Sequence, residues 1–304
     1  KAFKKKGKYS GVVSGFNDLD NMLGGLQNSD LVILAGRPSM GKTALATNIA
    51  FNAAKNLQDN NRKSSIAFFS LEMSSEQLST RILAEQSRIK SNDIRRGRIS
   101  DEQFDKFLET SKNISELPLY IDETPAISIA AMSNRSRRIK RLFGLDMIVV
   151  DYIQLMRGTF NNKDGRVQEI SQITQGLKAI AKELSVPVVA LSQLSRQVEQ
   201  RDDHKPQLAD LRESGSIEQD ADMVLFIYRA DRYDINEDED GNLTAGVAEI
   251  LLRKNRNGPT GKVKLKFIER FAKFADMSSS DGNENRKYQS KANGGFNSNE
   301  DNPF

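Results

Sequence analysis

Residues 36–43 of this chain read Gly36-Arg37-Pro38-Ser39-Met40-Gly41-Lys42-Thr43. This stretch fits the pattern G-x-x-x-x-G-K-[ST]; it follows an apolar run at 31–34 and opens a helical pattern over 43–57. In that setting the glycines let backbone N–H groups surround a phosphate, Lys42 supplies charge to the β and γ oxygens, and Thr43 can hold Mg²⁺. The stretch therefore predicts a P-loop that binds ATP or another nucleoside triphosphate together with Mg²⁺.

The apolar segments around the P-loop predict the fold class. Each segment is nearly continuous in hydrophobicity, which is typical of strands buried on both faces of a parallel sheet. Six such runs occupy 31–34, 66–69, 119–121, 147–150, 186–190 and 223–227. Apolar residues at three- and four-residue spacing predict helices over 43–57, 76–88, 127–143 and 167–184. The pattern predicts an α/β fold: a mostly parallel, twisted sheet flanked by helices and joined by right-handed crossovers.

The last third of the chain changes character. Two β-rich runs, at 248–252 and 263–267, flank a turn that reads Asn257-Gly258-Pro259-Thr260-Gly261. This predicts a C-terminal antiparallel β-hairpin. We expect one main domain over 15–277, because a chain of 304 residues is near the upper limit for a single α/β domain. Residues 1–14 are expected to form a basic linker, and the polar residues 278–304 a disordered tail.

Composition excludes several classes of protein. The 45 Lys and Arg against 41 Asp and Glu leave a net charge of only +4, a weak indication of a polyanionic partner. The absence of cysteine excludes disulfides and thiolate metal sites, and the single histidine, His204, argues against a His-rich metal site and is expected to be exposed. No apolar run approaches the roughly 20 residues that cross a bilayer, so we expect a soluble, cytoplasmic protein without membrane contact. The basic start at Lys1 suggests a fragment with sequence upstream.

Three polar residues follow predicted strands at the sheet edge where the P-loop should lie. Asp151 ends the run 147–150, as a carboxylate that binds Mg²⁺ would. Glu72, within Ser70-Leu71-Glu72-Met73-Ser74, is placed to orient and deprotonate water, and Gln193 is placed to sense the γ-phosphate. The residues alone leave simpler readings open: a solvated Asp151, a helix-capping Glu72 and an ordinary polar loop residue at Gln193.

The order of these motifs resembles a known family. Along the chain, the P-loop and Ser70-Leu71-Glu72-Met73-Ser74 come first. Four segments follow: Val150-Asp151-Tyr152-Ile153-Gln154-Leu155, Leu191-Ser192-Gln193-Leu194-Ser195-Arg196, the run 210–222 (DLRESGSIEQDAD) and Lys254-Asn255-Arg256-Asn257-Gly258-Pro259. With them, the chain closely resembles the C-terminal domain of bacterial replicative helicases of the DnaB type from about Gly15 to about Phe274. The run 211–222 is far more specific than a P-loop.

The resemblance implies a RecA-like ATPase core that works as a homohexameric ring around single-stranded DNA. Such a ring hydrolyses ATP at its subunit interfaces and moves 5′ to 3′ while unwinding DNA, with a primase and a helicase loader as partners. By the same resemblance Glu72 is the catalytic base, Asp151 the Mg²⁺ ligand and Gln193 the γ-phosphate sensor.

Further roles come from the resemblance alone. Lys254 and Arg256, two residues apart and so on one face of a strand, would reach the ATP site of the neighbouring subunit. Arg212, Glu213 and Gly215 resemble the family's pore loop, which follows successive DNA phosphates. Arg229 and Phe274 are assigned as nucleobase-stacking residues among the DNA contacts. Read without the resemblance, the Lys254/Arg256 pair would be a solvated strand edge, Arg229 a charge at a sheet end and Phe274 a core aromatic.

Other functions compete with the helicase. A recombinase-like ATPase would share the P-loop and the sheet but form filaments on DNA; residues 211–222 and 254–259 favour the helicase. A non-catalytic, nucleotide-gated DNA clamp would keep Lys42 and Thr43 but should lack Glu72, Gln193 and Arg256, all of which are present. A fused primase-helicase stays open for residues upstream.

Overall fold

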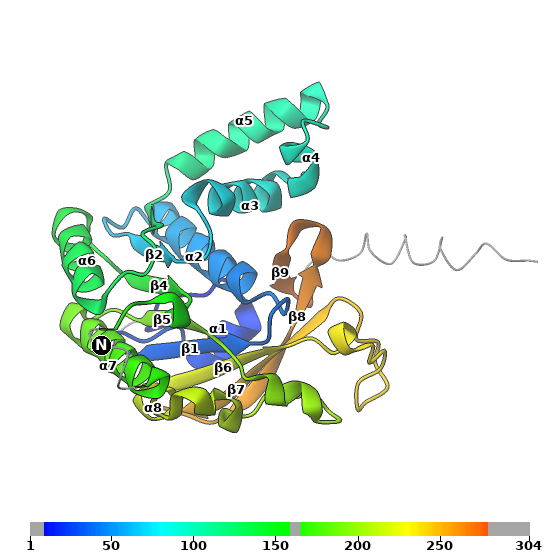
Figure 1. Cartoon of the computed structure of the whole chain (residues 1–304). Coiled ribbons are helices and arrows are strands. Elements are labelled where there is room, and N and C mark those ends of the chain that lie inside the picture. Colours follow the sequence, from blue (N-terminus) through cyan, green and yellow to red (C-terminus); the bar gives the residue numbers. More distant parts are fainter. Residues whose placement is uncertain (1–8, 159–164, 279–304) are drawn as a thin grey trace, which may run out of the picture.

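A single mixed sheet of nine strands organises the molecule in the computed structural model, which describes residues 9–158 and 165–278 and, at 212–216, the backbone alone. The strand order is β3-β2-β4-β5-β1-β6-β7-β8-β9 (Figure 1). The parallel strands are β1 (Leu31–Gly36), β2 (Ile66–Ser70), β3 (Leu119–Asp122), β4 (Met147–Asp151), β5 (Val188–Gln193) and β6 (Met223–Tyr228). The antiparallel strands are β7 (Val247–Asn255), β8 (Gly261–Ile268) and β9 (Lys273–Asp276). The predicted sheet and hairpin are confirmed.

Both faces of the sheet are buried, which explains why the parallel strands read as continuous apolar runs. In β1, Val32 and Leu34 join the core on one face, while Leu31, Ile33 and Ala35 join the core on the other. All five side chains are fully buried. This central strand carries the P-loop at its end, so a fully buried strand supports the nucleotide site.

Helices cover each face in a separate layer (Figure 1). The first layer contains α1 (Asn17–Leu23), α2 (Lys42–Asp59) and α3 (Ser75–Ser87). The second contains α6 (Ile129–Phe143), α7 (Arg166–Leu184) and α8 (Gly215–Asp220). Short 3-10 turns connect these elements: η2 (Ile153–Leu155), η3 (Arg196–Gln200), η4 (Leu208–Ser214), η5 (Ala230–Tyr233) and η6 (Glu269–Phe271). The four helices predicted from periodicity are all present.

Two helices outside these layers were not predicted: α4 (Ser91–Arg95) and α5 (Asp101–Ser115). None of their residues is buried, and α5 lies over α3 on the outside of the molecule (Figure 1). A sequence signal for α5 does exist, because the Ser100 side chain accepts from the Gln103 backbone and the Gln103 side chain accepts from the Ser100 backbone. This reciprocal capping box marks the start of α5, and Phe104, Phe107 and Leu108 after it have helical spacing.

The folded body begins before the expected boundary at residue 15. Val12 pairs with Leu26 through two backbone hydrogen bonds of 2.8 Å, and the Tyr9 hydroxyl donates to Asn21. The basic start of the expected linker and residues 279–304 of the expected tail lie outside the described residues. In the described ranges, every helix is too short or too polar to cross a lipid bilayer.

Candidate active site

The P-loop joins the buried strand β1 to the first turn of α2, and its backbone demands glycine at one point. Gly41 has a φ of 100°, and a Cβ there would lie 3.0 Å from Cζ of Phe274. A side chain at residue 41 would therefore be strained and would collide with an aromatic ring. Lys42, the first residue of α2, donates from Nζ to the carbonyls of Gly36 (2.8 Å) and Arg37 (3.1 Å).

The predicted strand-end residues lie at the same edge of the sheet as the P-loop. Gly36 at the end of β1 pairs with Gln193 at the end of β5. Asp151 at the end of β4 pairs with Ser70 at the end of β2, and the Leu71 backbone donates to the Asp151 carbonyl at 2.7 Å. Parallel pairing thus brings the candidate sensor and Mg²⁺ ligand level with the P-loop, and places Glu72 one residue beyond Leu71.

Asp151 is a buried carboxylate with capacity left for a ligand. It is 1% exposed, and its Oδ2 has no hydrogen-bond partner among the described residues. Burial raises its pKa to about 6, while a hydrogen bond with the Thr43 side chain lowers it. A hydroxyl and a carboxylate beside a phosphate-binding loop suit Mg²⁺, which takes one or two protein oxygens together with the oxygens of a phosphate. The residues therefore fit the expected ion.

Two cations share this edge with two carboxylates. Burial lowers the pKa of Lys42 to about 8, and the charges of Asp151 and Glu72 oppose that shift. Burial also lowers the pKa of Arg81 on α3, and the same two carboxylates oppose it. Glu72 itself is exposed, as a group that meets water should be. Arg81 was missed in the sequence, although an arginine beside Leu78 and Ile82 on the buried side of a helix is a recognisable signal.

Arg37 behaves differently from the rest of the P-loop. Its guanidinium is directed into the protein, where Nη1 donates to the Leu194 carbonyl at 2.8 Å and Nε donates to Glu199 at 2.9 Å. The residue is only 7% exposed. Its side chain therefore anchors the P-loop to the segment after β5, and only its backbone is placed to serve a phosphate.

Gln193 is exposed at the end of β5, and its backbone is fixed by a neighbouring amide. Gln154 accepts from the Gln193 N–H at 3.3 Å and donates to the Gln193 carbonyl, also at 3.3 Å. Gln154 also donates to the Ser192 hydroxyl at 2.9 Å. The strand end is thereby fixed while the Gln193 side chain is left facing solvent.

Lys254 and Arg256 lie at the other edge of the sheet. Asn255 between them pairs with Met223, and Met223 pairs with Val32, four residues before the end of β1. Their backbone is thus roughly 13 Å along the sheet from the P-loop of the same chain. Lys254 Nζ donates to the carbonyls of Glu218 (2.5 Å) and Ala221 (2.7 Å) at the end of α8.

Arg256 lies on the same side of the strand, because it too donates to the end of α8, at the Gln219 carbonyl. It also approaches Asp222 at 3.6 Å. A β-bulge sets this side: Val224 pairs with Lys254 but Leu225 pairs with Leu252, so Arg253 is the extra residue. Ahead of the bulge, Leu252 packs on the opposite face with the α2 layer. The bulge therefore turns the Lys254/Arg256 pair towards α8.

Comparison with known proteins decides the family. The sequence pattern of the DnaB-like helicase C terminal domain matches residues 11–276. This chain belongs to that family. It is 49% identical over 294 residues to the replicative DNA helicase DnaB of Rickettsia typhi, covering 91% of this chain and 59% of that protein. It is 46% identical over 273 residues to the replicative DNA helicase DnaB of Geobacillus stearothermophilus, covering 90% and 58%. The chain therefore spans less than two thirds of these relatives.

Comparison with solved structures points to the same family. One of them, described as an ATPase domain, superimposes with a TM-score of 0.83 at 36% identity, covering 91% of this chain and 95% of that one. A DnaB-like replicative helicase, described with its interactions with primase, superimposes with a TM-score of 0.82 at 38% identity, covering 91% and 64%. The expected RecA-like fold is thereby confirmed.

In this DnaB-like domain, the candidate DNA-binding segment forms a helical junction. Arg212 and Glu213 are in η4, and Gly215 begins α8. The resemblance to a pore loop, which the sequence suggested for this segment, stays a prediction. The side chains of these residues lie outside the described structure.

Arg229 and Phe274 are not placed as DNA contacts. Both are only 2% exposed. The Phe274 ring lies against Gly41, and the Arg229 guanidinium lies 4.0 Å above the Phe267 ring, which itself packs on Phe274. Phe274 belongs to the α2 side of the sheet, whereas the residues next to the DNA-binding segment, such as Leu211, belong to the other side. The structure therefore does not support their assignment to DNA, and it places both beside the P-loop.

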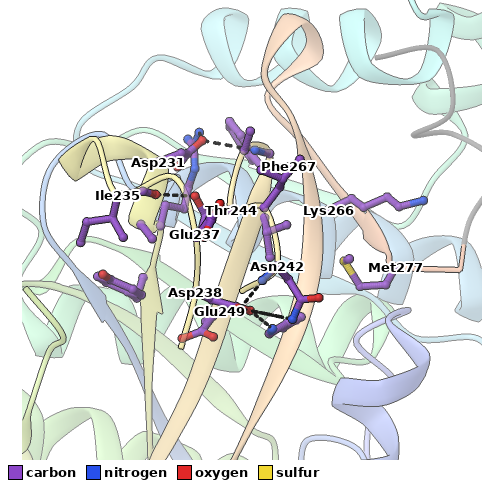
Figure 2. Close-up of a pocket in the computed structure, with 18 of the residues that line it drawn as sticks. Asp231, Ile235, Glu237, Asp238, Asn242, Thr244, Glu249, Lys266, Phe267 and Met277 are labelled. Carbon is purple, nitrogen blue, oxygen red and sulfur yellow. Dashed lines mark hydrogen bonds and ion pairs between the residues drawn. The ribbon is translucent and has the colours of Figure 1, made fainter. Parts of the chain in front are cut away.

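A groove of about 1360 Å³ runs outward from Arg229, between the 230–246 connection and the β7–β8 hairpin (Figure 2). Asp231 and Phe267 lie at one end, and Asp238, Asn242 and Glu249 lie at the other (Figure 2). Arg229 forms an ion pair with Asp231 at 2.8 Å, and its Nε and Nη1 have no hydrogen-bond partner in the described ranges. The residues that line the groove do not include the P-loop residues 36–43, and the groove approaches the P-loop only through Phe267, which packs on Phe274 beside Gly41.

His204 is the remaining correction. We expected it to be exposed, but it is half-buried and stacks on Tyr233 with ring centroids 4.3 Å apart.

Proposed function

We propose that this chain is the motor domain of a replicative DNA helicase. It hydrolyses ATP, or another nucleoside triphosphate, at the interfaces of a homohexameric ring, and it moves 5′ to 3′ on single-stranded DNA to unwind the duplex at the replication fork. One observation carries the proposal: the Lys254/Arg256 pair lies at the sheet edge opposite its own P-loop. That separation is what a site shared between subunits needs, because two cations too far from their own nucleotide can serve a neighbour's.

The residues at the P-loop edge have distinct roles in this proposal. Glu72, exposed beside the buried charges, orients and deprotonates the attacking water. Lys42 neutralises the β- and γ-phosphates, and Gln193 contacts the γ-phosphate from the end of the adjacent strand. Thr43 and Asp151 would hold Mg²⁺, which when bound neutralises phosphate charge.

The transition state of phosphoryl transfer carries charge that one subunit leaves partly uncompensated. An arginine supplied from a neighbour stabilises such charge and is worth about three to five orders of magnitude in rate in known systems. Arg256 and Lys254 are held on one side of β7 by the end of α8, so both can point at one target. Hydrolysis would then depend on ring assembly.

Single-stranded DNA is the proposed track. Arg212, Glu213 and Gly215 would contact its phosphates, and Gly215 permits a close approach of backbone to DNA. Six copies of Arg212, one from each subunit, would supply the positive charge that faces the DNA, and backbone N–H groups would supply the other phosphate contacts, although each chain has a net charge of only +4. Binding should therefore be sensitive to salt and nearly independent of sequence.

The protein partners and the cellular location of the motor domain are also part of the proposal. A primase partner is supported by the primase interactions described for the DnaB-like helicase that this chain resembles at 38% identity. A helicase loader and a place at the replication fork in the bacterial cytoplasm rest on the family alone.

The test is unwinding of forked duplexes that carry either a 5′ or a 3′ single-stranded loading arm. With ATP and Mg²⁺, we expect unwinding only when the 5′ arm is present. The Glu72→Gln variant should bind ATP and DNA but neither hydrolyse nor unwind, since it keeps the shape of the site and removes the base. The Lys42→Ala variant should lose tight nucleotide binding.

Each contrary outcome has a clear meaning. Unwinding that requires the 3′ arm would reverse the proposed direction. DNA-stimulated hydrolysis with filaments on DNA and no unwinding would favour the recombinase-like alternative. Turnover at the wild-type rate by Glu72→Gln would remove that residue as the base.

A further inference from the structure

The short helix η3 begins three residues after Gln193 and is attached to the P-loop. Arg37 donates from Nε to Glu199 Oε1 at 2.9 Å, and its Nη2 lies 2.9 Å from the same oxygen. Arg37 Nη1 also donates to the Leu194 carbonyl at 2.8 Å, and Leu194 N–H donates to the Gly36 carbonyl at 3.4 Å. The first two residues of the P-loop, Gly36 and Arg37, are therefore hydrogen-bonded to Leu194, before η3, and to Glu199, within it.

The other end of η3 is attached to the turn that carries the DNA-binding segment. Arg201, directly after η3, forms a fork with Asp210 of η4: Nη1 donates to Oδ1 at 2.8 Å and Nη2 donates to Oδ2 at 2.5 Å. Asp210 is 3% exposed and also accepts from the Gln207 backbone at 2.7 Å. Paired hydrogen bonds between a guanidinium and a carboxylate fix orientation as well as distance.

The two attachments form one continuous path. Glu199 and Arg201 are two residues apart, and Val198 beside them is buried in the core, so η3 cannot move independently of either contact. Backbone contact supports the path, since Ser195 N–H donates to the Asp210 carbonyl at 3.2 Å. Asp210 is two residues before Arg212. A displacement of Arg37 would thus reach the DNA-binding segment through charge-assisted contacts.

We propose that η3, with its Arg37–Glu199 and Arg201–Asp210 pairs, couples the nucleotide state of the P-loop to the position of the DNA-binding segment. Glu199 and Arg201 are positioning residues in this scheme: neither touches the nucleotide or the DNA. The inference rests on the proposed function, because it presupposes that residues 212–215 bind DNA. It adds a route that begins at the P-loop itself and is separate from the γ-phosphate contact assigned to Gln193.

The geometry predicts how the two pairs behave together. They act in series, so breaking either one should interrupt the route, and breaking both should add little. A purely structural role would instead give additive losses of stability and a parallel loss of basal hydrolysis. The double variant therefore separates coupling from folding.

The experiment compares the whole 304-residue chain with Glu199→Gln, Arg201→Gln and the double variant. For each we would measure ATP hydrolysis with and without oligo-dT, the Kd for oligo-dT in a non-hydrolysable ATP analogue, and thermal unfolding. Arg201→Lys, which keeps the charge and loses the fork, is included in case Arg201→Gln unfolds. The matched control is Glu183→Gln, which breaks an ion pair of similar geometry between Arg137 on α6 and Glu183 on α7.

We expect basal hydrolysis close to wild type in both single variants, and a loss of DNA stimulation of roughly fivefold or more. The double variant should match the weaker single variant, Arg201→Lys should retain part of the stimulation, and the control should behave as wild type. Stimulation that survives in both single variants would overturn the inference while leaving the helicase in place. So would equal losses of basal and stimulated rates. A wild-type chain that DNA does not stimulate would instead overturn the proposed function, and the inference with it.

Discussion

Glu85 is a buried carboxyl group that lies away from the catalytic edge. It is 4% exposed on α3, where it accepts hydrogen bonds from Asn48 on α2 and from Gln86. Asn48 in turn accepts from the Phe274 backbone of β9 at 2.7 Å. Burial raises the pKa of Glu85 to about 7, and Lys273 and the hydrogen bonds oppose the shift. The folded protein therefore holds this proton more tightly than the unfolded chain does.

The consequence is a pH-dependent stability. The contribution of Glu85 is fully present below its unfolded pKa of 4.5 and is lost as pH rises through about 7. Glu85→Gln, which mimics the protonated form, should raise the free energy of unfolding by about 1 to 3 kcal/mol above the folded pKa and change it little near pH 5. Urea unfolding at both pH values measures this, with exposed Glu109→Gln as the control. An equal effect of Glu85→Gln at both pH values would show that Glu85 is ionised in the fold.

For single residues, the sequence predicts where a residue lies in the fold better than it predicts where its side chain points. Asp151 and Gln193 meet the P-loop because the carboxyl ends of parallel strands share one edge, a consequence of strand order alone. The direction of Arg37 could not be predicted, since its partner Glu199 is 162 residues away in the chain. Phe274 was misplaced for the same reason: only the tertiary fold brings β9 against Gly41.

Among the elements, β7 shows how one extra residue serves the site. Strand side chains alternate between faces, so in a regular strand of the same sequence, with Arg253 paired and no bulge, the Lys254/Arg256 pair would be on the α2 side of the sheet. With the bulge, the pair is held by carbonyls at the end of α8. Nothing in the sequence marks the bulge, because it depends on the register between β6 and β7.

Deletion of Arg253 removes the extra residue and should leave the Lys254/Arg256 pair facing α8, because Leu252 still opposes Leu225 and Lys254 still opposes Val224. We expect the deletion variant to bind ATP with near wild-type Kd and to keep most of its hydrolysis. Arg253→Ala keeps the bulge and should hydrolyse ATP normally. Steady-state rates and nucleotide titrations, with thermal unfolding to verify the fold, measure the difference. A large loss of hydrolysis in the deletion variant, with Arg253→Ala still active, would show that the pair has left the α8 side and would contradict this reading of the register.

Helix α5 and strand β9 were not predicted, and they were missed for different reasons. Helix α5 has no buried residue, but Phe104, Phe107 and Leu108 are spaced as on one helix face and its capping box marks its start. Strand β9 is four residues long at the edge of the sheet, and it is defined by pairing with β8. The spacing and the cap therefore made α5 predictable, whereas β9 depends on tertiary pairing.

For the whole molecule, the separation of the P-loop from the Lys254/Arg256 pair predicts complementation between inactive subunits. Arg256→Ala and Lys42→Ala should each be nearly inactive alone. A mixture joins intact P-loops to intact arginines at about a quarter of the interfaces of a randomly mixed ring. Hydrolysis should therefore recover on mixing. Mixing Arg256→Ala with the Lys42→Ala/Arg256→Ala double variant should restore nothing, and the absence of recovery in the first mixture, once co-assembly is shown by cross-linking, would argue against a shared site.

The position of β9 late in the sequence affects when the nucleotide site can be completed during translation. Phe274 packs against Gly41, and Asp276 accepts from the Asn17 backbone at 3.1 Å, so β9 packs beside the P-loop and the start of α1. The ribosome adds the strand that packs on Gly41 more than 200 residues after the P-loop. We therefore expect a nascent chain to carry its phosphate-binding sequence long before that sequence has its final packing, and a newly made subunit to bind nucleotide only when translation of the domain is nearly finished.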